Sequence, residues 1–313
     1  MRVTALAGGI GAGKFLRGLV RAVPPTDVTV VVNTADDIAM HGLHICPDLD
    51  SVTYWLGDVF DRERGWGRRG ETFRATEELR RFDPDRAWFN LGDLDLATHL
   101  FRTGLLGEGV SLSEVTARVA TRFGIASRIL PITDDRVTTR VDIVSMGREL
   151  DLHFQEYWVQ RRAQDEVKAI RYRGAEAARP APGVLEAIAG AEAIVICPSN
   201  PIASIGPILA VPGVREALAA RRERVVGISP IVGGAPLAGM ADRLMPVAGF
   251  AVTAVGAAEC YAGLLGAWVV DEADRTLASR VEALGLRVTV TDTVMTDDAK
   301  AEALARTALG LFR

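Results

Sequence analysis

The stretch Val3-Thr-Ala-Leu-Ala-Gly8-Gly9-Ile-Gly11-Ala-Gly13-Lys14 decides the fold of this 313-residue chain. A short apolar run leads into four glycines, and an amphipathic helical pattern follows over residues 15–23. Glycine lets backbone N–H groups approach a ligand closely, and a helix N-terminus carries partial positive charge. We therefore expect a strand, a loop that binds a phosphate group, and a helix; a tight turn without a ligand is the alternative.

The loop fits neither of the two common phosphate-binding motifs. Phe15 stands where a P-loop NTPase needs Ser or Thr to bind Mg²⁺. The dinucleotide motif G-x-G-x-x-G lacks its third glycine, whether it is counted from Gly9 or from Gly11. Ordinary ATPase or GTPase chemistry is therefore disfavoured.

Length and composition indicate a cytoplasmic enzyme. The chain is long enough for two domains, or for one large α/β domain with an insertion. A net charge of −4 gives no reason to expect a nucleic acid or a membrane as partner, and three scattered cysteines fit a reducing compartment. The apolar start is too short for a signal peptide. Residues 245–270, with Glu259 as their only charge, imitate a membrane span, but we expect a buried helix followed by a strand.

The second predicted strand, residues 28–33, ends in an acidic pair. The run is β-branched and unbroken, as in a parallel strand buried on both faces, and Asn33, Asp36 and Asp37 stand at its end. Ligands of open α/β sheets lie at the C-terminal strand ends. Two carboxylates beside a phosphate loop predict a Mg²⁺ site, although one of them could simply cap the next helix.

Further acidic residues follow along the chain. Asp48 and Asp50 begin a predicted helix; both could cap it, or one could turn toward a ligand hydroxyl or a metal. The neighbouring His41, His44 and Cys46 are too loosely spaced to predict a zinc site.

A similar acidic cluster occurs later in the chain. Residues 88–90 read as a short strand, after which a helix begins at Asp93 or Asp95; capping accounts for only one of these two carboxylates. Trp66, in the arginine-rich stretch 62–69, is either a stacking lid or part of a solvated loop.

Residues 111–175 break the alternation of strands and helices. A hairpin pattern covers 137–154, and a basic, aromatic helix is predicted over 156–169. We expect 111–175 to be an inserted cap or dimerisation subdomain, and 1–110 with 176–313 to form the main, nucleotide-binding domain. The fold class is α/β: a Rossmann-like, mostly parallel sheet with helices on both faces, plus a smaller inserted helical and hairpin subdomain.

The second half of the main domain supplies another candidate loop. The strand 193–197 ends in Pro198-Ser199-Asn200-Pro201, and Ser204-Ile-Gly206 follows closely. Such a rigid loop offers hydroxyl and N–H donors that suit phosphate or ribose.

Taken together, these motifs resemble the 2-phospho-L-lactate transferase family, which makes the deazaflavin coenzyme F420. The matching stretches keep their order over nearly the whole chain: Gly8-Gly9-Ile-Gly11, Asn33-Thr-Ala-Asp36-Asp37, Cys46-Pro-Asp48-Leu-Asp50, Leu91-Gly-Asp93-Leu-Asp95-Leu-Ala-Thr-His99, Pro198-Ser-Asn-Pro201, Ser204-Ile-Gly-Pro207 and Ser229-Pro-Ile-Val-Gly-Gly234. The resemblance implies that a guanosine diphosphate ester of lactate or enolpyruvate gives its phospho-acid part to the ribityl hydroxyl of the deazaflavin FO, with release of GMP and help from Mg²⁺. Separately, the hydrophobic helices and the hairpin of the inserted block favour a homodimer.

The same resemblance implies roles for individual residues. Asp36, Asp37 and Asp50 are the metal candidates, and Asp50 and Asp37 are the catalytic candidates. The nucleotide- and deazaflavin-binding candidates are Gly8, Gly9, Gly11, Asn33, Asn90, Asp93, Asp95, His99, Ser199, Asn200, Pro201, Ser204 and Gly206. Leu94 departs from the family, which usually has Arg or Lys between the two acids.

A second hypothesis comes from a different functional class. The related gluconeogenesis-factor family consists of nucleotide-sugar-binding regulatory proteins, and it shares the opening glycine loop and the Asp pair. The stretches 46–50 and 91–99 favour the transferase. The sequence does not distinguish a lactate from an enolpyruvate donor.

Overall fold

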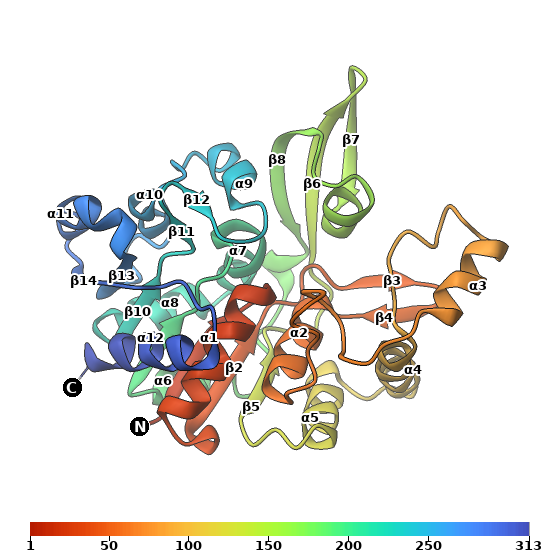
Figure 1. Ribbon diagram of the computed structural model, residues 1–313, viewed down its shortest axis with the longest axis horizontal. Coiled ribbons are helices and arrows are strands. Elements are labelled where there is room, and N and C mark those ends of the chain that lie inside the picture. Colours follow the sequence, from red (N-terminus) through yellow and green to blue (C-terminus); the bar gives the residue numbers. More distant parts are fainter. Residues whose placement is uncertain (313) are drawn as a thin grey trace.

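A seven-stranded parallel sheet forms the centre of the molecule (Figure 1). The computed structural model describes residues 1–312, and the strands follow the order β14-β13-β10-β9-β1-β2-β5. Val3 of the first strand pairs with Val28 on one side and Ala193 on the other. The strands are β1 (Val3–Ala7), β2 (Val28–Val32), β5 (Arg128–Pro131), β9 (Ala193–Ile196), β10 (Val225–Ile228), β13 (Ala267–Asp271) and β14 (Arg287–Thr291).

Helices cover both faces of this sheet because its strands are apolar on both sides. Alternate residues of β1 illustrate this: Ala5 packs into a core with α1 and α12, whereas Leu6 packs into a second core on the opposite face. The first face carries α1 (Gly9–Ala22), α2 (Pro47–Leu56), α5 (Leu112–Arg122) and α12 (Asp298–Gly310). The second face carries α6 (Val184–Gly190), α7 (Gly206–Ala210), α8 (Val214–Ala219), α9 (Ala241–Val247), α10 (Ala254–Glu259) and α11 (Ala278–Glu282). The predicted Rossmann-like fold is confirmed.

The long connection between β2 and β5 builds one wall of the future site. It contains the β3–β4 hairpin (Ile38–Met40 and Leu43–Ile45), α3 (Arg74–Phe82) and α4 (Asp93–Gly107). The predicted strand at 88–90 is wrong, because Trp88 and Phe89 lie in a turn and pack against the hairpin instead of pairing with another strand.

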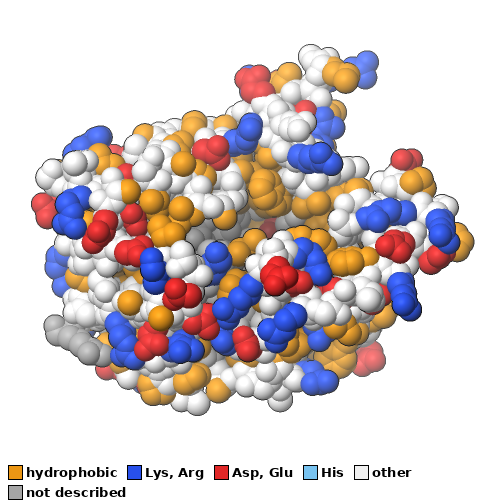
Figure 2. Space-filling model, viewed as in Figure 1, with side chains coloured by type: hydrophobic (Ala, Val, Ile, Leu, Met, Phe, Trp, Pro, Cys, Tyr) orange, Lys and Arg blue, Asp and Glu red, His pale blue; other side chains and the backbone are white. Residues whose placement is uncertain are grey.

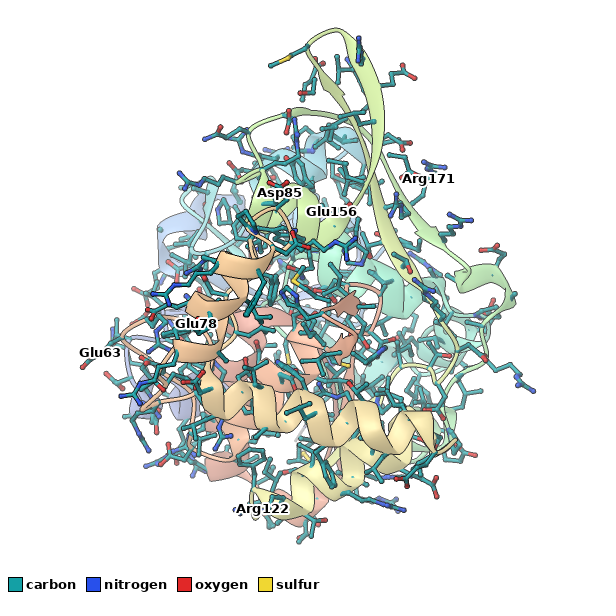
Figure 3. The ribbon with its side chains drawn as sticks, turned by 90° about the vertical axis from the view of Figure 1, so that its right-hand side faces the viewer. Glu63, Glu78, Asp85, Arg122, Glu156 and Arg171 are labelled. Carbon is teal, nitrogen blue, oxygen red and sulfur yellow. The ribbon has the colours of Figure 1, made fainter. Side chains whose placement is uncertain are left out.

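A separate three-stranded antiparallel sheet projects from the main body. Its order is β7-β6-β8, with β6 at Thr138–Ser145, β7 at Arg148–His153 and β8 at Glu166–Arg173. Figure 3 shows these strands from the side, with Glu156 and Arg171 on opposite sides of them. β5 lies within the predicted insertion 111–175 but pairs with β2 of the main sheet, so the projecting part is shorter than 111–175. The boundaries of the insertion as a separate subdomain stay a prediction.

The helix predicted over 156–169 is wrong. Only Glu156–Gln160 is helical, as one π-helical turn, and the chain then enters β8. Exposed and half-buried side chains alternate along β8, so its period of two suits pairing with β6 better than a helix.

The apolar stretch at 245–270 forms the end of α9, α10 and the start of β13, so the prediction of buried helix followed by strand is confirmed. Within residues 1–312, the helices are all too short or too polar to traverse a bilayer. A small β11–β12 hairpin (Ile231–Val232 and Ala235–Pro236) precedes α9.

Candidate functional site

A pocket of about 700 Å³ opens at the C-terminal ends of the parallel strands. Figure 2 shows it as a hollow near the centre of one face, below the projecting sheet. Gly8 follows β1, Asp36 follows β2, Ser199 follows β9 and Thr293 follows β14, so loops from both halves of the sheet meet there. This is the edge at which open α/β sheets bind ligands.

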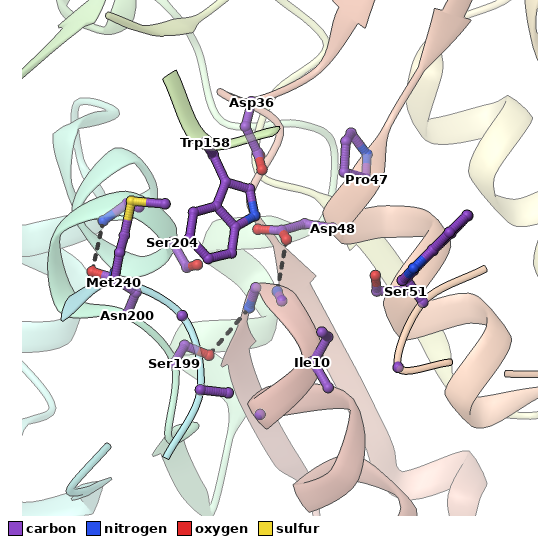
Figure 4. A pocket seen from close by; sticks show the side chains of 18 of the residues that line it. Ile10, Asp36, Pro47, Asp48, Ser51, Trp158, Ser199, Asn200, Ser204 and Met240 are labelled. Carbon is purple, nitrogen blue, oxygen red and sulfur yellow. Dashed lines mark hydrogen bonds between the residues drawn. The ribbon is translucent and has the colours of Figure 1, made fainter. Parts of the chain in front are cut away.

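The glycine loop between β1 and α1 forms the floor of the pocket (Figure 4). The Gly8 N–H donates to Ser199 Oγ at 3.3 Å, and the Gly9 N–H donates to Asp48 Oδ1 at 2.7 Å. Gly9 has φ of 72°, a left-handed conformation that favours glycine. A Cβ on Gly8 would lie 2.6 Å from the Cβ of Ser204, so this position has no room for a side chain.

Two buried carboxylates, Asp36 and Asp48, lie together above this loop; we call them the acidic pair. Asn33 Nδ2 donates to both, to Asp36 Oδ1 at 2.7 Å and to Asp48 Oδ2 at 3.0 Å. Gln155 Nε2, at the base of the projecting sheet, donates to Asp36 Oδ2 at 3.1 Å. No Arg, Lys or His of residues 1–312 makes an ion pair with either carboxylate.

Electrostatics make the acidic pair a good cation site. Burial, followed by repulsion from Asp48, raises the pKa of Asp36 well above its usual range. Burial also raises the pKa of Asp48 to about 6. Two buried carboxylates without a balancing positive charge, beside backbone N–H groups, present the oxygen ligands that Mg²⁺ prefers. The residues therefore fit a magnesium ion held by Asp36 and Asp48.

Asp37 turns away from Asp36 and joins a different group. Its Oδ2 lies 3.2 Å from His44 Nε2 and accepts a hydrogen bond from Cys46 Sγ at 2.9 Å. Burial raises the pKa of Asp37. The sequence spacing did not predict that His44 and Cys46 would meet, and His41 lies outside the group.

Asp50, the other sequence-based metal candidate, is held by Arg102 of α4. Arg102 Nη1 donates to Asp50 Oδ2 at 3.1 Å, and Nη2 bonds the second carboxylate oxygen. Both side chains are almost fully buried. The two-point pairing satisfies both oxygens, so Asp50 is less suited to bind a cation than the acidic pair. Sequence reasoning missed Arg102, although its spacing of three from His99 on one helix was a usable signal.

A buried hydrogen-bond network continues from this ion pair along α4. His99 Nδ1 lies 3.2 Å from Arg102 Nη1, and His99 Nε2 lies 3.5 Å from Asp95 Oδ2. The hydroxyl of Tyr54 donates to Asp95 Oδ1. Burial alone would raise the pKa of Asp95, but His99 and Tyr54 hold this pKa below its ordinary value. His99 and Tyr54 therefore favour the ionised form of Asp95 in the wall of the pocket.

The remaining predicted residues divide into two sets. The pocket is lined by Gly8, Gly9, Gly11, Asn90, Asp95, His99, Ser199, Asn200 and Ser204. Asn33 lies beneath the acidic pair. Pro201 and Gly206 are outside the lining, in and after the π-helical turn Pro201–Ile205.

Asp93 also lies outside the lining. It accepts backbone N–H bonds from Arg74 at 3.2 Å and Ala75 at 3.1 Å, at the start of α3.

Three further residues line the pocket besides the sequence-based site candidates. Lys14 of α1 faces the pocket, is exposed, and makes no ion pair within residues 1–312. Trp158, from the π-helical turn, extends over the acidic pair in Figure 4. Trp66 also lines the pocket, with Arg64 5.1 Å from its ring, and its role as a stacking lid stays a prediction.

Fold and pocket together define a Rossmann-like α/β protein with a glycine-rich loop beside two buried carboxylates. The model of the family described as 2-phospho-L-lactate transferase CofD matches residues 3–309, so the chain belongs to this transferase family. The family resemblance expected from the motifs is thus confirmed.

Relatives agree with this assignment, and a solved structure agrees with the fold. The chain is 51% identical over 312 residues to a phosphoenolpyruvate transferase of Streptomyces griseus, covering 99% of this chain and 98% of the relative. It is 42% identical over 327 residues to a phosphoenolpyruvate transferase of Mycolicibacterium smegmatis, covering 99% and 98%. A solved structure of protein BH3568 from Bacillus halodurans superimposes with a TM-score of 0.62 at 18% identity, covering 98% of this chain and 99% of that one, which supports the fold alone.

Proposed function

We propose that this chain is a phosphoenolpyruvate transferase of coenzyme F420 biosynthesis. The supporting observation is a single pocket in which the Gly8–Gly9 backbone, the acidic pair and Lys14 converge. The curated relatives that carry this name are about half identical to the chain over almost its full length. That similarity favours enolpyruvate over lactate as the donor's acid part.

The two ends of the pocket suit the two substrates. The guanosine diphosphate ester lies along the strand-end loops, with its phosphates at Gly8, Gly9 and Lys14. The deazaflavin FO lies at the other end, where Trp66, Phe89 and Asn90 line the pocket. A diphosphate and a carboxylate that enter beside Asp36 and Asp48 need a divalent cation to offset the repulsion. When bound there, Mg²⁺ neutralises charge on the phosphates.

The reaction is a phosphoryl transfer. The terminal ribityl oxygen of FO forms a bond to the phosphorus that carries enolpyruvate, and the bond from that phosphorus to the bridging oxygen breaks. The bridging oxygen keeps the electron pair and leaves as part of GMP. Positioning and charge neutralisation contribute most of the rate in such reactions.

The proton of the FO hydroxyl passes to a pocket carboxylate. Asp50 and Asp37, the sequence-based candidates, are engaged by Arg102 and by His44 with Cys46. Asp95 has no arginine ion pair within residues 1–312 and borders His99, whose Nε2 is buried without a hydrogen-bond partner. We assign Asp95 as the proton acceptor and His99 as the group that moves the proton onward.

The test is a direct assay of the purified chain with FO, Mg²⁺ and the guanosine diphosphate ester of enolpyruvate or of lactate. Mass spectrometry should show the FO phosphodiester of enolpyruvate and an equal amount of GMP. Asp48→Asn should abolish product, while Asp93→Asn, which changes a carboxylate outside the pocket lining, should retain it. Binding of a UDP-sugar without binding of FO would instead support the regulatory gluconeogenesis-factor function.

A further inference from the structure

The β3–β4 hairpin gathers three metal-ligating side chains on one face, separate from the acidic pair. His44 and Cys46 are two residues apart, so their side chains leave the chain on the same side. Asp37 directly precedes β3, and the register that pairs Ile38 with Ile45 places it opposite Cys46. Hairpin geometry alone therefore brings a carboxylate, an imidazole and a thiol together.

The ligand atoms are close enough to share one ion. Asp37 Oδ2 lies 3.2 Å from His44 Nε2 and 2.9 Å from Cys46 Sγ, and the ligand atoms all lie within 4.8 Å of one another. Around tetrahedral zinc, with metal–ligand bonds of about 2.0–2.3 Å, neighbouring ligand atoms are separated by roughly 3.3–3.6 Å. Side-chain shifts of up to about an ångström would thus admit the ion.

A second, independent observation points to a ligand at this place. The other carboxylate oxygen of Asp37, Oδ1, is buried and has no hydrogen-bond partner within residues 1–312. The Asp37 side chain is only 9% exposed, so this oxygen lacks the water that would normally satisfy it. The His44 side chain is 37% exposed and gives an ion a route from solvent.

We propose that Asp37, His44 and Cys46 bind a thiophilic divalent cation such as Zn²⁺, at a site distinct from the acidic pair. One thiolate, one imidazole and one carboxylate are donors that zinc accepts and that Mg²⁺ does not favour. Three protein ligands leave a fourth position for water. Binding forms the sulfur–metal bond and releases the Cys46 S–H proton to solvent, so the carboxylate and the thiolate together neutralise the ion.

The electrostatic surroundings allow this ion. Arg102 is the nearby cation, since it donates to the carbonyl oxygen of His44 at 3.4 Å, but Asp50 already neutralises it. Ile45, between the two hairpin ligands, lines the pocket. A bound ion would therefore fix one wall of the pocket, and this inference holds whichever substrate the pocket takes.

The test measures metal binding by the full, metal-free chain without any turnover. Calorimetry with Zn²⁺ in excess Mg²⁺ should show one ion per chain and a buffer-dependent heat from one released proton. Replacement by Co²⁺ should give a thiolate-to-cobalt charge-transfer absorption. Cys46→Ser and His44→Ala should each weaken Zn²⁺ binding by at least about tenfold, which is the effect of even an outer-shell partner.

Matched controls separate this site from adventitious binding. Cys260→Ser removes another free cysteine, and His41→Asn removes a hairpin histidine whose left-handed backbone Asn tolerates. Both should keep wild-type affinity, as should Asp48→Asn. Cys46 is fully buried, so the Cys46→Ser variant could fail to fold. In that case the test rests on His44→Ala, which changes a partly exposed side chain.

Two results would overturn the proposal. One is cobalt binding without the charge-transfer absorption. The other is Zn²⁺ affinity that is unchanged in His44→Ala but lost in Asp48→Asn, which would place the ion on the acidic pair. A failed transferase assay would affect neither result, because no substrate is present.

Discussion

Replacing Arg102 by methionine should remove a large part of the stability of this protein. The Arg102 side chain is 3% exposed and that of its partner Asp50 is 7% exposed, so the substitution leaves a carboxylate buried without its counter-charge. Breaking a buried pair from one side costs about 3–5 kcal/mol, a large fraction of the stability of an ordinary domain. Arg102 also contacts the ring of His99 and the carbonyl oxygen of His44, and these contacts are lost as well.

The magnitude can be isolated with a double-mutant cycle and a surface control. Replacing both partners, as Asp50→Leu with Arg102→Met, should restore most of the loss, because an apolar pair of similar volume avoids the cost of burying charge. Arg81→Met breaks an exposed pair with Glu78 on α3, whose side chains are 76% and 58% exposed. It should cost less than about 1 kcal/mol.

Urea unfolding followed by tryptophan fluorescence measures these differences as midpoint shifts at constant slope. The reasoning is refuted if Arg102→Met is no more destabilising than Arg81→Met, or if the double variant is as unstable as the single one. Either result would mean that Asp50 finds water or another partner on its own, and Asp50 would again be a candidate metal ligand.

Three further predictions test the pocket. Gly8→Ala should destabilise the fold by about 1–3 kcal/mol and abolish nucleotide binding, because the new methyl group meets Ser204. The control Gly104→Ala changes an open helical position and should be neutral or slightly stabilising. Calorimetric melting measures both differences in stability. Lys14→Ala should weaken GDP binding about tenfold in titration calorimetry with Mg²⁺, by loss of a charge-assisted hydrogen bond of about 1.5 kcal/mol; unchanged affinity would remove Lys14 from the site. The folded-state pKa of Asp48 is about 6 against an ordinary 3.8, so the metal-free folded chain binds more protons than the unfolded chain in this window. Its unfolding free energy should therefore fall as pH rises through the window; Asp48→Asn should flatten that fall, and an equally steep fall in the variant would show that Asp48 is not its source.

The main sheet and the position of the pocket were predictable because they depend on local patterns. An unbroken β-branched run such as residues 28–33 is typical of a strand that is buried on both faces of a sheet. Strands of this kind must end at one edge, so the glycine loop and Asp36 were bound to lie near each other.

The identity of the acidic pair was less accessible from sequence. Asp36 and Asp37 are neighbours, and only the turn before β3 decides that one faces Asp48 while the other faces His44. Asp48 could equally have been a helix cap, since an acid in a first helical turn is common. Its true partner, the N–H of Gly9, is remote in sequence and could not be identified from spacing.

The projecting sheet shows a different limit. Residues 166–173 alternate charged with less polar side chains except at Ala169-Ile170, but the preceding aromatic residues favoured a helix. Pairing with β6, a long-range contact, decides the outcome. Arg102 escaped notice for the same reason, because its partner Asp50 lies on another helix.

The hydrogen bond from the Gly9 N–H to Asp48 has a thermodynamic consequence. In the ligand-free chain a carboxylate of the protein occupies the place where a phosphate oxygen would be expected. An arriving phosphate must displace the Asp48 carboxylate from the Gly9 N–H. A cation that attracts Asp48 moves this carboxylate away from the N–H before the phosphate arrives. Anion and cation therefore favour each other's entry, and linkage requires the effect to be reciprocal. The protein would thus hold either ion alone weakly and the two together tightly, which protects the acidic pair from stray phosphates in the absence of metal.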